Sequence, residues 1–118
     1  MKIFRIDSDN EYEITEHGST SVFVSSFVDI DRSASIHWMH FDPRGLIGRH
    51  SLTSPQIFLI VEGEGWVKSD NPEPIPVMKG DGVFWETGDW QEAGSDSGMT
   101  VILMESKLPD PAAFFARF

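Results

Sequence analysis

A histidine comes just before a long apolar segment in the stretch GRHSLTSPQIFLIVEGEGW, residues 48–66. A histidine in this position often points into a cavity, where its ring can bind a metal or form hydrogen bonds. The same stretch holds Leu52 and Gln56 at positions where further ligands could lie. Leucine has no donor atom, and a neutral amide is a weak ligand for the transition metals that imidazole and carboxylate hold. The residue types therefore favour a hydrogen-bonding pocket around His50 over a metal site.

Short strand-like segments, separated by turn residues, must position these side chains. Val, Ile, Phe and Trp dominate the segments, and Gly, Asp, Asn and Pro lie between them. No segment of ten or more residues has a helical period before residue 109. The predicted strands are 2–6, 21–28, 34–41, 56–62, 64–68, 83–85 and 100–105. The pattern predicts one all-β domain over residues 1–118, a sandwich or barrel, with turns that include DPRG (42–45) and EGEG (62–65).

The spacing around His50 resembles the first of the two cupin motifs, G(x)5HxH(x)3–4E(x)6G. Five residues separate Arg44 from His50, and Leu52 follows two positions later. Three residues then lead to Gln56, and six more lead to Gly63. The spacing matches the motif, although three of its five defining residue types are replaced.

A second stretch resembles the other cupin motif, G(x)5PxG(x)2H(x)3N. Five residues lead from Gly80 to Glu86, Gly88 follows, and two and three residues then lead to Gln91 and Ser95. Sixteen residues lie between Gly63 and Gly80, a length typical of compact single-domain cupins. The resemblance implies a double-stranded β-helix, also called a jelly-roll barrel.

Cupins usually hold a metal with two histidines and a glutamate from the first motif and a histidine from the second. The corresponding positions here are His50, Leu52, Gln56 and Gln91. Only one of these residues is a good metal ligand. We therefore expect no tightly held metal and no other cofactor.

Strand parity predicts which side chains accompany His50 inside the barrel. His37 and Met39 share the parity of Phe41 in SIHWMHF, and Phe58 is predicted to face inward from the strand that begins at Gln56. Two alternatives stay open: His50 could bind a metal or only a backbone carbonyl, and the two glutamines could satisfy each other or a buried water. The predicted ligand-binding residues are His50, Gln56, Gln91, His37, Met39 and Phe58.

Composition excludes several other classes of protein. With 19 acidic and 9 basic residues the formal net charge is −10, which disfavours nucleic acid as a partner. The absence of cysteine excludes disulfides and thiolate chemistry. Met1 leads into a polar segment, and no apolar run is long enough to span a bilayer, so we expect a cytoplasmic protein without membrane contact.

The chain has more apolar surface than a small barrel can enclose. The tail LPDPAAFFARF predicts a short C-terminal helix, with Asp110 as its cap and Pro111 at its first position. In SVFVSSFV, apolar residues fall on both parities. A sheet that is apolar on both faces is usually covered by a second layer, so we expect a homodimer.

Three classes of function are compatible with these residues. The first is a protein that binds a small organic ligand in the barrel without a tightly held metal. The alternative is a cupin enzyme, of the dioxygenase, isomerase or lyase type, with His50 as metal ligand or as general acid or base. In the third class the barrel is an interaction scaffold. The fold alone does not decide between them, and no catalytic residue is predicted.

Overall fold

The protein is built almost entirely from β-strands. The computed structural model describes residue 1, residues 11–30 and residues 34–106, and of residues 27–30 it describes only the backbone. The described residues contain no α-helix, only the short 3-10 turn η2 (Glu16–Gly18). The strands are β1 (Tyr12–Glu13), β2 (Thr20–Ile30), β3 (Ala34–Ser51), β4 (Gln56–Lys68), β5 (Ile75–Met78), β6 (Gly82–Trp85), β7 (Trp90–Ser95) and β8 (Met99–Ser106).

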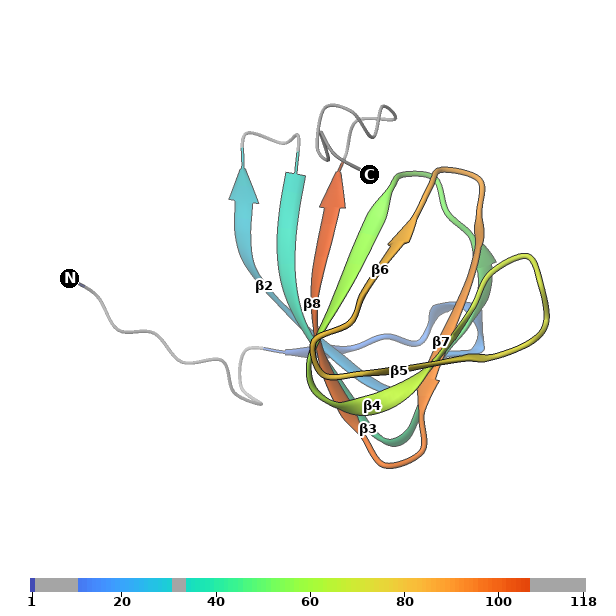
Figure 1. Ribbon diagram of the computed structural model, residues 1–118. Helices are drawn as coiled ribbons and strands as arrows, with labels where there is room; N and C mark the ends of the chain where they lie inside the picture. Colours follow the sequence, from blue (N-terminus) through green and yellow to red (C-terminus); the bar gives the residue numbers. More distant parts are fainter. Residues whose placement is uncertain (2–10, 31–33, 107–118) are drawn as a thin grey trace.

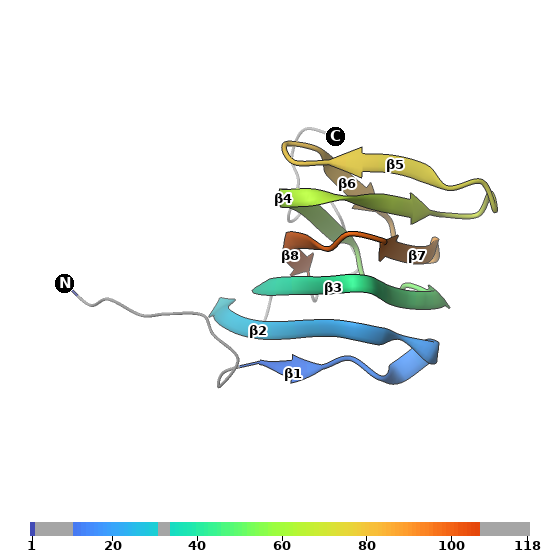
Figure 2. The same ribbon diagram turned by 90° about the horizontal axis from the view of Figure 1, so that it is seen from below.

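The two long strands, β3 and β4, close these elements into a barrel. The first half of each pairs with β8, and the second half of each pairs with β7, always antiparallel. A ring of hydrogen-bonded strands therefore runs from β3 through β8, β4 and β7 back to β3. Figure 1 shows β2, the first half of β3, β8, β4 and β6 side by side in one half of the molecule. Figure 2 shows β1 and β5 at opposite edges, as the pairing requires.

Each long strand bends at a residue whose backbone has a positive φ. In β3 this residue is Arg44 (φ 67°), and in β4 it is Gly63 (φ 78°). The pairing register of β3 with β2 shifts around the bend of β3, and that of β4 with β8 shifts just before Gly63. A Cβ on Gly63 would also overlap the carbonyl oxygen of Gly98, so glycine is required there by space as well as by conformation.

The two bends correct the prediction of hairpin turns at DPRG and EGEG. Both segments lie inside continuous strands and carry the chain from the pairing with β8 to the pairing with β7. Proline and glycine correctly indicated a change of direction. They do not distinguish a bend within a strand from a turn between two strands, because both need the same residue types. The predicted strands 56–62 and 64–68 are accordingly one strand, β4.

The other predicted strands have mixed outcomes. Strands 21–28, 34–41, 83–85 and 100–105 are confirmed within β2, β3, β6 and β8. The predicted strand 2–6 and the predicted C-terminal helix lie outside the described residues. Within those residues, no helix is long and apolar enough to cross a membrane.

The sequence pattern missed three strands, β1, β5 and β7, and the last two have unfavourable compositions. Pro76 lies in β5, which pairs only with β4 and can therefore tolerate a missing N–H. β7 contains Gly94, where a Cβ would come within 2.5 Å of the Trp66 ring. The small residue that lowers the strand propensity of β7 is thus required by a close ring contact.

Alternation along the strands separates an inner from an outer face. Phe41, Phe58 and Val101 are fully buried in the barrel, in one continuous core with Val22 and Ile60. Their neighbours in sequence point outward and are less buried. The all-β barrel that was predicted is therefore confirmed, and its inner face carries both the core and the cavity described next.

Candidate functional site

A cavity of about 320 Å³ opens at one end of the barrel. Its walls come from the inward residues of the strands and from the segment between β1 and β2. The lining residues are Tyr12, Ile14, Glu16, His17, Ser19, Val24, His37, Met39, Ile47, His50, Gln56, Phe58, Gln91, Leu103 and Glu105. The volume is at the lower end of the range for small-molecule sites.

Three polar side chains form a hydrogen-bonded row across the cavity. Gln91 Nε2 donates to Gln56 Oε1 at 2.8 Å, and Gln56 Nε2 donates to Glu105 Oε2 at 3.0 Å. Gln56 and Glu105 are direct neighbours across β4 and β8, while Gln91 reaches them from β7. Both hydrogen bonds run in the same direction along the row, because the NH2 group of each glutamine donates to the next residue toward Glu105.

His50 adjoins this row from β3. It lies opposite Gln91 in the β3–β7 pairing and is half-buried. Its Nδ1 donates to the Gly48 carbonyl oxygen at 2.8 Å. In the neutral ring, a proton on Nδ1 leaves Nε2 as the acceptor. One of the two alternatives for His50, a hydrogen bond to a backbone carbonyl, is therefore correct for Nδ1. The side chain still lines the cavity.

The segment that precedes β2 forms one wall of the cavity. The His17 ring stacks on His50, with 4.4 Å between centroids and 7° between planes. Gly48 holds this segment in place, because its N–H donates to Ser19 Oγ at 3.0 Å. A Cβ on Gly48 would overlap the carbonyl oxygen of His17, so only glycine allows this close approach.

The remaining walls are mostly apolar. Met39 and Phe58 are buried, and Phe58 contacts Trp85 edge to face at 4.8 Å. His37 also lines the cavity, but its ring nitrogens contact Ser26 Oγ at 2.6 Å and Ser35 Oγ at 2.9 Å. These bonds fix the ring of His37 against the wall.

All six predicted ligand-binding residues line this one cavity. Their binding of a ligand stays a prediction. Leu52 instead lies in the buried core, and Glu86 is exposed on the surface. Of the aromatic residues near the two motifs, Phe58 alone is part of the lining.

Sequence reasoning missed nine of the fifteen lining residues, among them Glu105, Glu16 and His17. Glu105 shares the parity of Val101 and Leu103, so strand alternation could have found it. Glu16 and His17 lie in a 3-10 turn, and no periodic signal places such a turn over a barrel.

The donor set does not fit the metal that the cupin resemblance implies. Leu52 does not line the cavity, and the amides of Gln56 and Gln91 are hydrogen-bonded to each other. In the described part of the chain, no group of three or more acidic or histidine side chains could hold a metal ion. His50 alone among the motif positions keeps a strong donor atom.

We therefore expect the purified protein to contain far less than one equivalent of iron, zinc, nickel or manganese. Inductively coupled plasma mass spectrometry on protein prepared without added metal tests this. The matched variant is His50→Ala. Stoichiometric metal in the parent protein that disappears in this variant would contradict the expectation and would favour the enzyme hypothesis.

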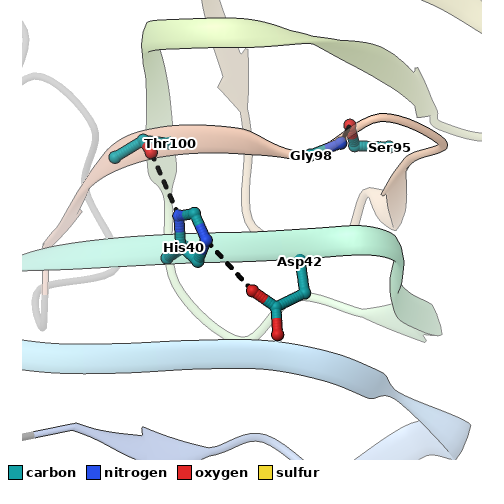
Figure 3. Close-up of polar contacts among 5 residues, drawn as sticks. All are labelled: His40, Asp42, Ser95, Gly98 and Thr100. Carbon is teal, nitrogen blue, oxygen red and sulfur yellow. Dashed lines mark hydrogen bonds and ion pairs between the residues drawn. The ribbon is translucent and has the colours of Figure 1, made fainter. Parts of the chain in front are cut away.

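A second polar arrangement lies on the outer face. His40 Nδ1 is 3.2 Å from Thr100 Oγ1, and His40 Nε2 is 3.1 Å from Asp42 Oδ1 (Figure 3). A hydroxyl, an imidazole and a carboxylate in line resemble a nucleophilic site in composition. None of the three residues lines the cavity, and we assign them a role in tying β3 to β8.

Solved structures reveal what this architecture is similar to. A predicted oxalate decarboxylase from Thermotoga maritima matches with a TM-score of 0.75 and 18% identity, over 89% of this chain and 100% of that chain. An RmlC-like cupin from Shewanella frigidimarina matches with a TM-score of 0.71 and 19% identity, over 98% of this chain and 97% of that one. The polyketide cyclase RemF from Streptomyces resistomycificus matches with a TM-score of 0.75 and 12% identity, over 89% and 80%.

The barrel has the cupin fold, and the predicted fold is confirmed. No protein-family model and no curated protein sequence matches the chain. At identities this low, the structural similarity defines the fold and not the activity. Function must therefore be argued from the cavity of this chain.

Proposed function

We propose that the protein binds a small organic molecule in the barrel cavity, without a tightly held metal. The observation that carries the proposal is the row from Gln91 through Gln56 to Glu105, which lies beside the apolar wall of Met39 and Phe58. Small-molecule sites typically combine a concave, mostly apolar wall with a few convergent polar groups. Gln91 is 2% exposed, and a polar side chain that is buried so deeply has a desolvation cost that a ligand role would explain.

The only two glutamines of the chain, Gln56 and Gln91, both line the cavity. Their side-chain NH2 groups give separate proton–nitrogen NMR signals and therefore report directly on the site. We expect some members of a library of small alcohols, amines, amides and acids to shift both signals. Saturation at micromolar to millimolar concentration corresponds to about 4–8 kcal/mol of binding free energy.

The matched variants are Gln91→Leu and Trp90→Leu. Gln91 is 2% exposed and faces the cavity, whereas its neighbour Trp90 is 42% exposed and contacts Arg49. Gln91→Leu should abolish the shifts of the Gln56 signal while the backbone spectrum stays folded, and Trp90→Leu should leave them intact. Ligands that bind equally well to the Gln91 variant, or no ligand at all, would refute the proposal.

A metal-independent enzyme is the second candidate. The hydrogen bond from His50 Nδ1 to Gly48 favours it, because the ring then presents Nε2 to the cavity as a base. Mass spectrometry of every bound library member after incubation separates the two candidates. Conversion that is lost in His50→Gln, with binding retained, would favour the enzyme.

We also propose that the outer sheet face forms a homodimer contact. Two cross-strand rows of apolar side chains cross it: Trp38, Ile102 and Leu59 in one, and Ile36, Met104, Ile57 and Phe84 in the other. Most of these side chains are only partly buried in the single chain. A second copy that lays the same face on this one would cover both rows.

We expect light scattering at micromolar concentration to give twice the mass of one chain. Ile102→Lys, in the centre of the face, should produce a monomer, whereas Ile75→Lys on the edge strand β5 should not. The same measurement without residues 109–118 tests whether the tail takes part. A monomeric parent protein would rule the dimer out.

A further inference from the structure

The polar atoms that the cavity offers to a ligand are predominantly acceptors. His50 uses its Nδ1 proton on Gly48, so Nε2 presents a lone pair. Ser19 Oγ accepts from the Gly48 N–H, so its own proton stays as one donor among these acceptors. The carboxylates of Glu105 and Glu16 accept and do not donate.

Glu105 determines which way both glutamine amides point. A carboxylate oxygen accepts only, so the atom of Gln56 that contacts it is the NH2 group. Gln56 Oε1 must then face Gln91, which in turn offers its own NH2 group. The oxygen and the NH2 group of a glutamine amide are nearly the same in shape, so it is the Glu105 carboxylate that fixes the orientation of both amides.

The end of this row leaves an acceptor without a partner. Gln91 is 2% exposed, and its Oε1 makes no hydrogen bond within the described part of the chain, although its Nε2 does. No side-chain oxygen or nitrogen in that part is both fully enclosed and unpaired. Gln91 Oε1 is therefore in contact with the open space of the cavity, where a ligand donor can reach it.

The formal charges of the lining agree with this pattern. Among the residues that the structure describes, the lining includes two carboxylates, Glu16 and Glu105, and neither lysine nor arginine. The whole chain adds a net charge of −10. A ligand with a carboxylate or phosphate would meet negative charge and few donors, whereas a cation would be attracted into the mouth.

On the basis of the proposed function, we propose that the ligand of this cavity is a small organic cation with a protonated amine and a compact apolar body. The ammonium group donates to Gln91 Oε1 and His50 Nε2, and the Glu105 carboxylate at the other end of the row adds negative charge. The apolar body lies on Val24, Met39, Ile47, Phe58 and Leu103. Both acceptors belong to directly paired residues of β3 and β7.

Three probes with one body but different head groups test this inference: 2-phenylethylamine, 2-phenylethanol and 3-phenylpropionate. Each is titrated into the labelled full-length protein while the Gln56 and Gln91 NH2 signals are followed. We expect the amine to bind at least about tenfold more tightly than the alcohol, because hydrogen bonds to a charged group are stronger than neutral ones. The acid should bind more weakly than either.

Glu105→Gln and Glu86→Gln are the matched charge variants. Both remove one negative charge, but Glu86 is exposed and lies outside the cavity lining. Glu105→Gln should weaken the amine about tenfold or more and leave the alcohol nearly unchanged, whereas Glu86→Gln should change neither by more than about twofold.

Three outcomes would overturn the inference. Tighter binding of the acid or the alcohol than of the amine, with shifts at Gln56 and Gln91, would refute the cation while leaving a ligand-binding cavity in place. Failure of all three probes would also refute it, and the broader library would then decide separately whether the cavity binds ligands at all. Equal losses of amine affinity in Glu105→Gln and Glu86→Gln would also refute it, because the attraction would then come from the net charge of the protein and not from the cavity.

Discussion

Phe58→Ala is expected to lower the free energy of unfolding by about 3 kcal/mol, near the lower end of the range for a phenylalanine removed from a core. Phe58 is fully buried and packs edge to face on Trp85. Its ring also forms part of the cavity wall. The space left by the ring therefore joins a cavity that water can enter, which reduces the cost of the void. For a domain with about 5–15 kcal/mol of total stability, the loss is still large.

Urea unfolding followed by tryptophan fluorescence measures this change. Met78→Ala is the control, because Met78 is 58% exposed on β5 and its truncation should cost less than about 0.5 kcal/mol. A loss below about 1 kcal/mol in Phe58→Ala would mean that the wall collapses into the gap, and the cavity described here would then be wrong in shape.

Gly48→Ala should destabilise the protein by about 1–3 kcal/mol, the usual cost of overpacking. The new Cβ would overlap the His17 carbonyl oxygen, which belongs to the backbone and cannot rotate away. Movement of this segment should break the hydrogen bond from Gly48 to Ser19 and separate the stacked rings of His17 and His50. The wall of the cavity that this segment forms should therefore open.

Gly82→Ala provides the control for Gly48→Ala. Its Cβ would meet no atom closer than 3.9 Å, and its backbone has no positive φ. Urea unfolding gives the stability of both variants, and NMR shifts of residues 16–19 report on the segment that precedes β2. Unchanged shifts and stability in Gly48→Ala would show that the segment does not rest on this glycine.

Sequence patterns predicted the barrel and one side of its cavity. Alternation placed Met39 on the inner face of its strand, and the motif spacing located His50 and Gln91, because both kinds of pattern are repeated along strands of regular geometry. The same alternation applies to Glu105, which was not predicted because it lies outside both motifs. The chemistry of the pocket depends on this residue as much as on the histidine.

The rest of the site depends on contacts that no local pattern encodes. His17 reaches His50 only because β1 pairs with β2 and Gly48 has no side chain in the way. The bends at Arg44 and Gly63 are also not encoded locally. A strand that bends and continues has the same residue types at the bend as a hairpin has in its turn. Tertiary pairing, and not residue preference, decides between them.

The continuity of β3 and β4 through their corners has a consequence for how the chain folds. Because each long strand pairs with β8 in its first half and with β7 in its second half, neither half of the barrel is complete without the other, and we expect a single cooperative unfolding transition. Closure also requires residues 34–41 to meet residues 99–106, which lie far along the chain. Contacts of such separation are slow to form, so folding should take milliseconds to seconds, and the cavity should arise only in the final, rate-limiting assembly of the barrel.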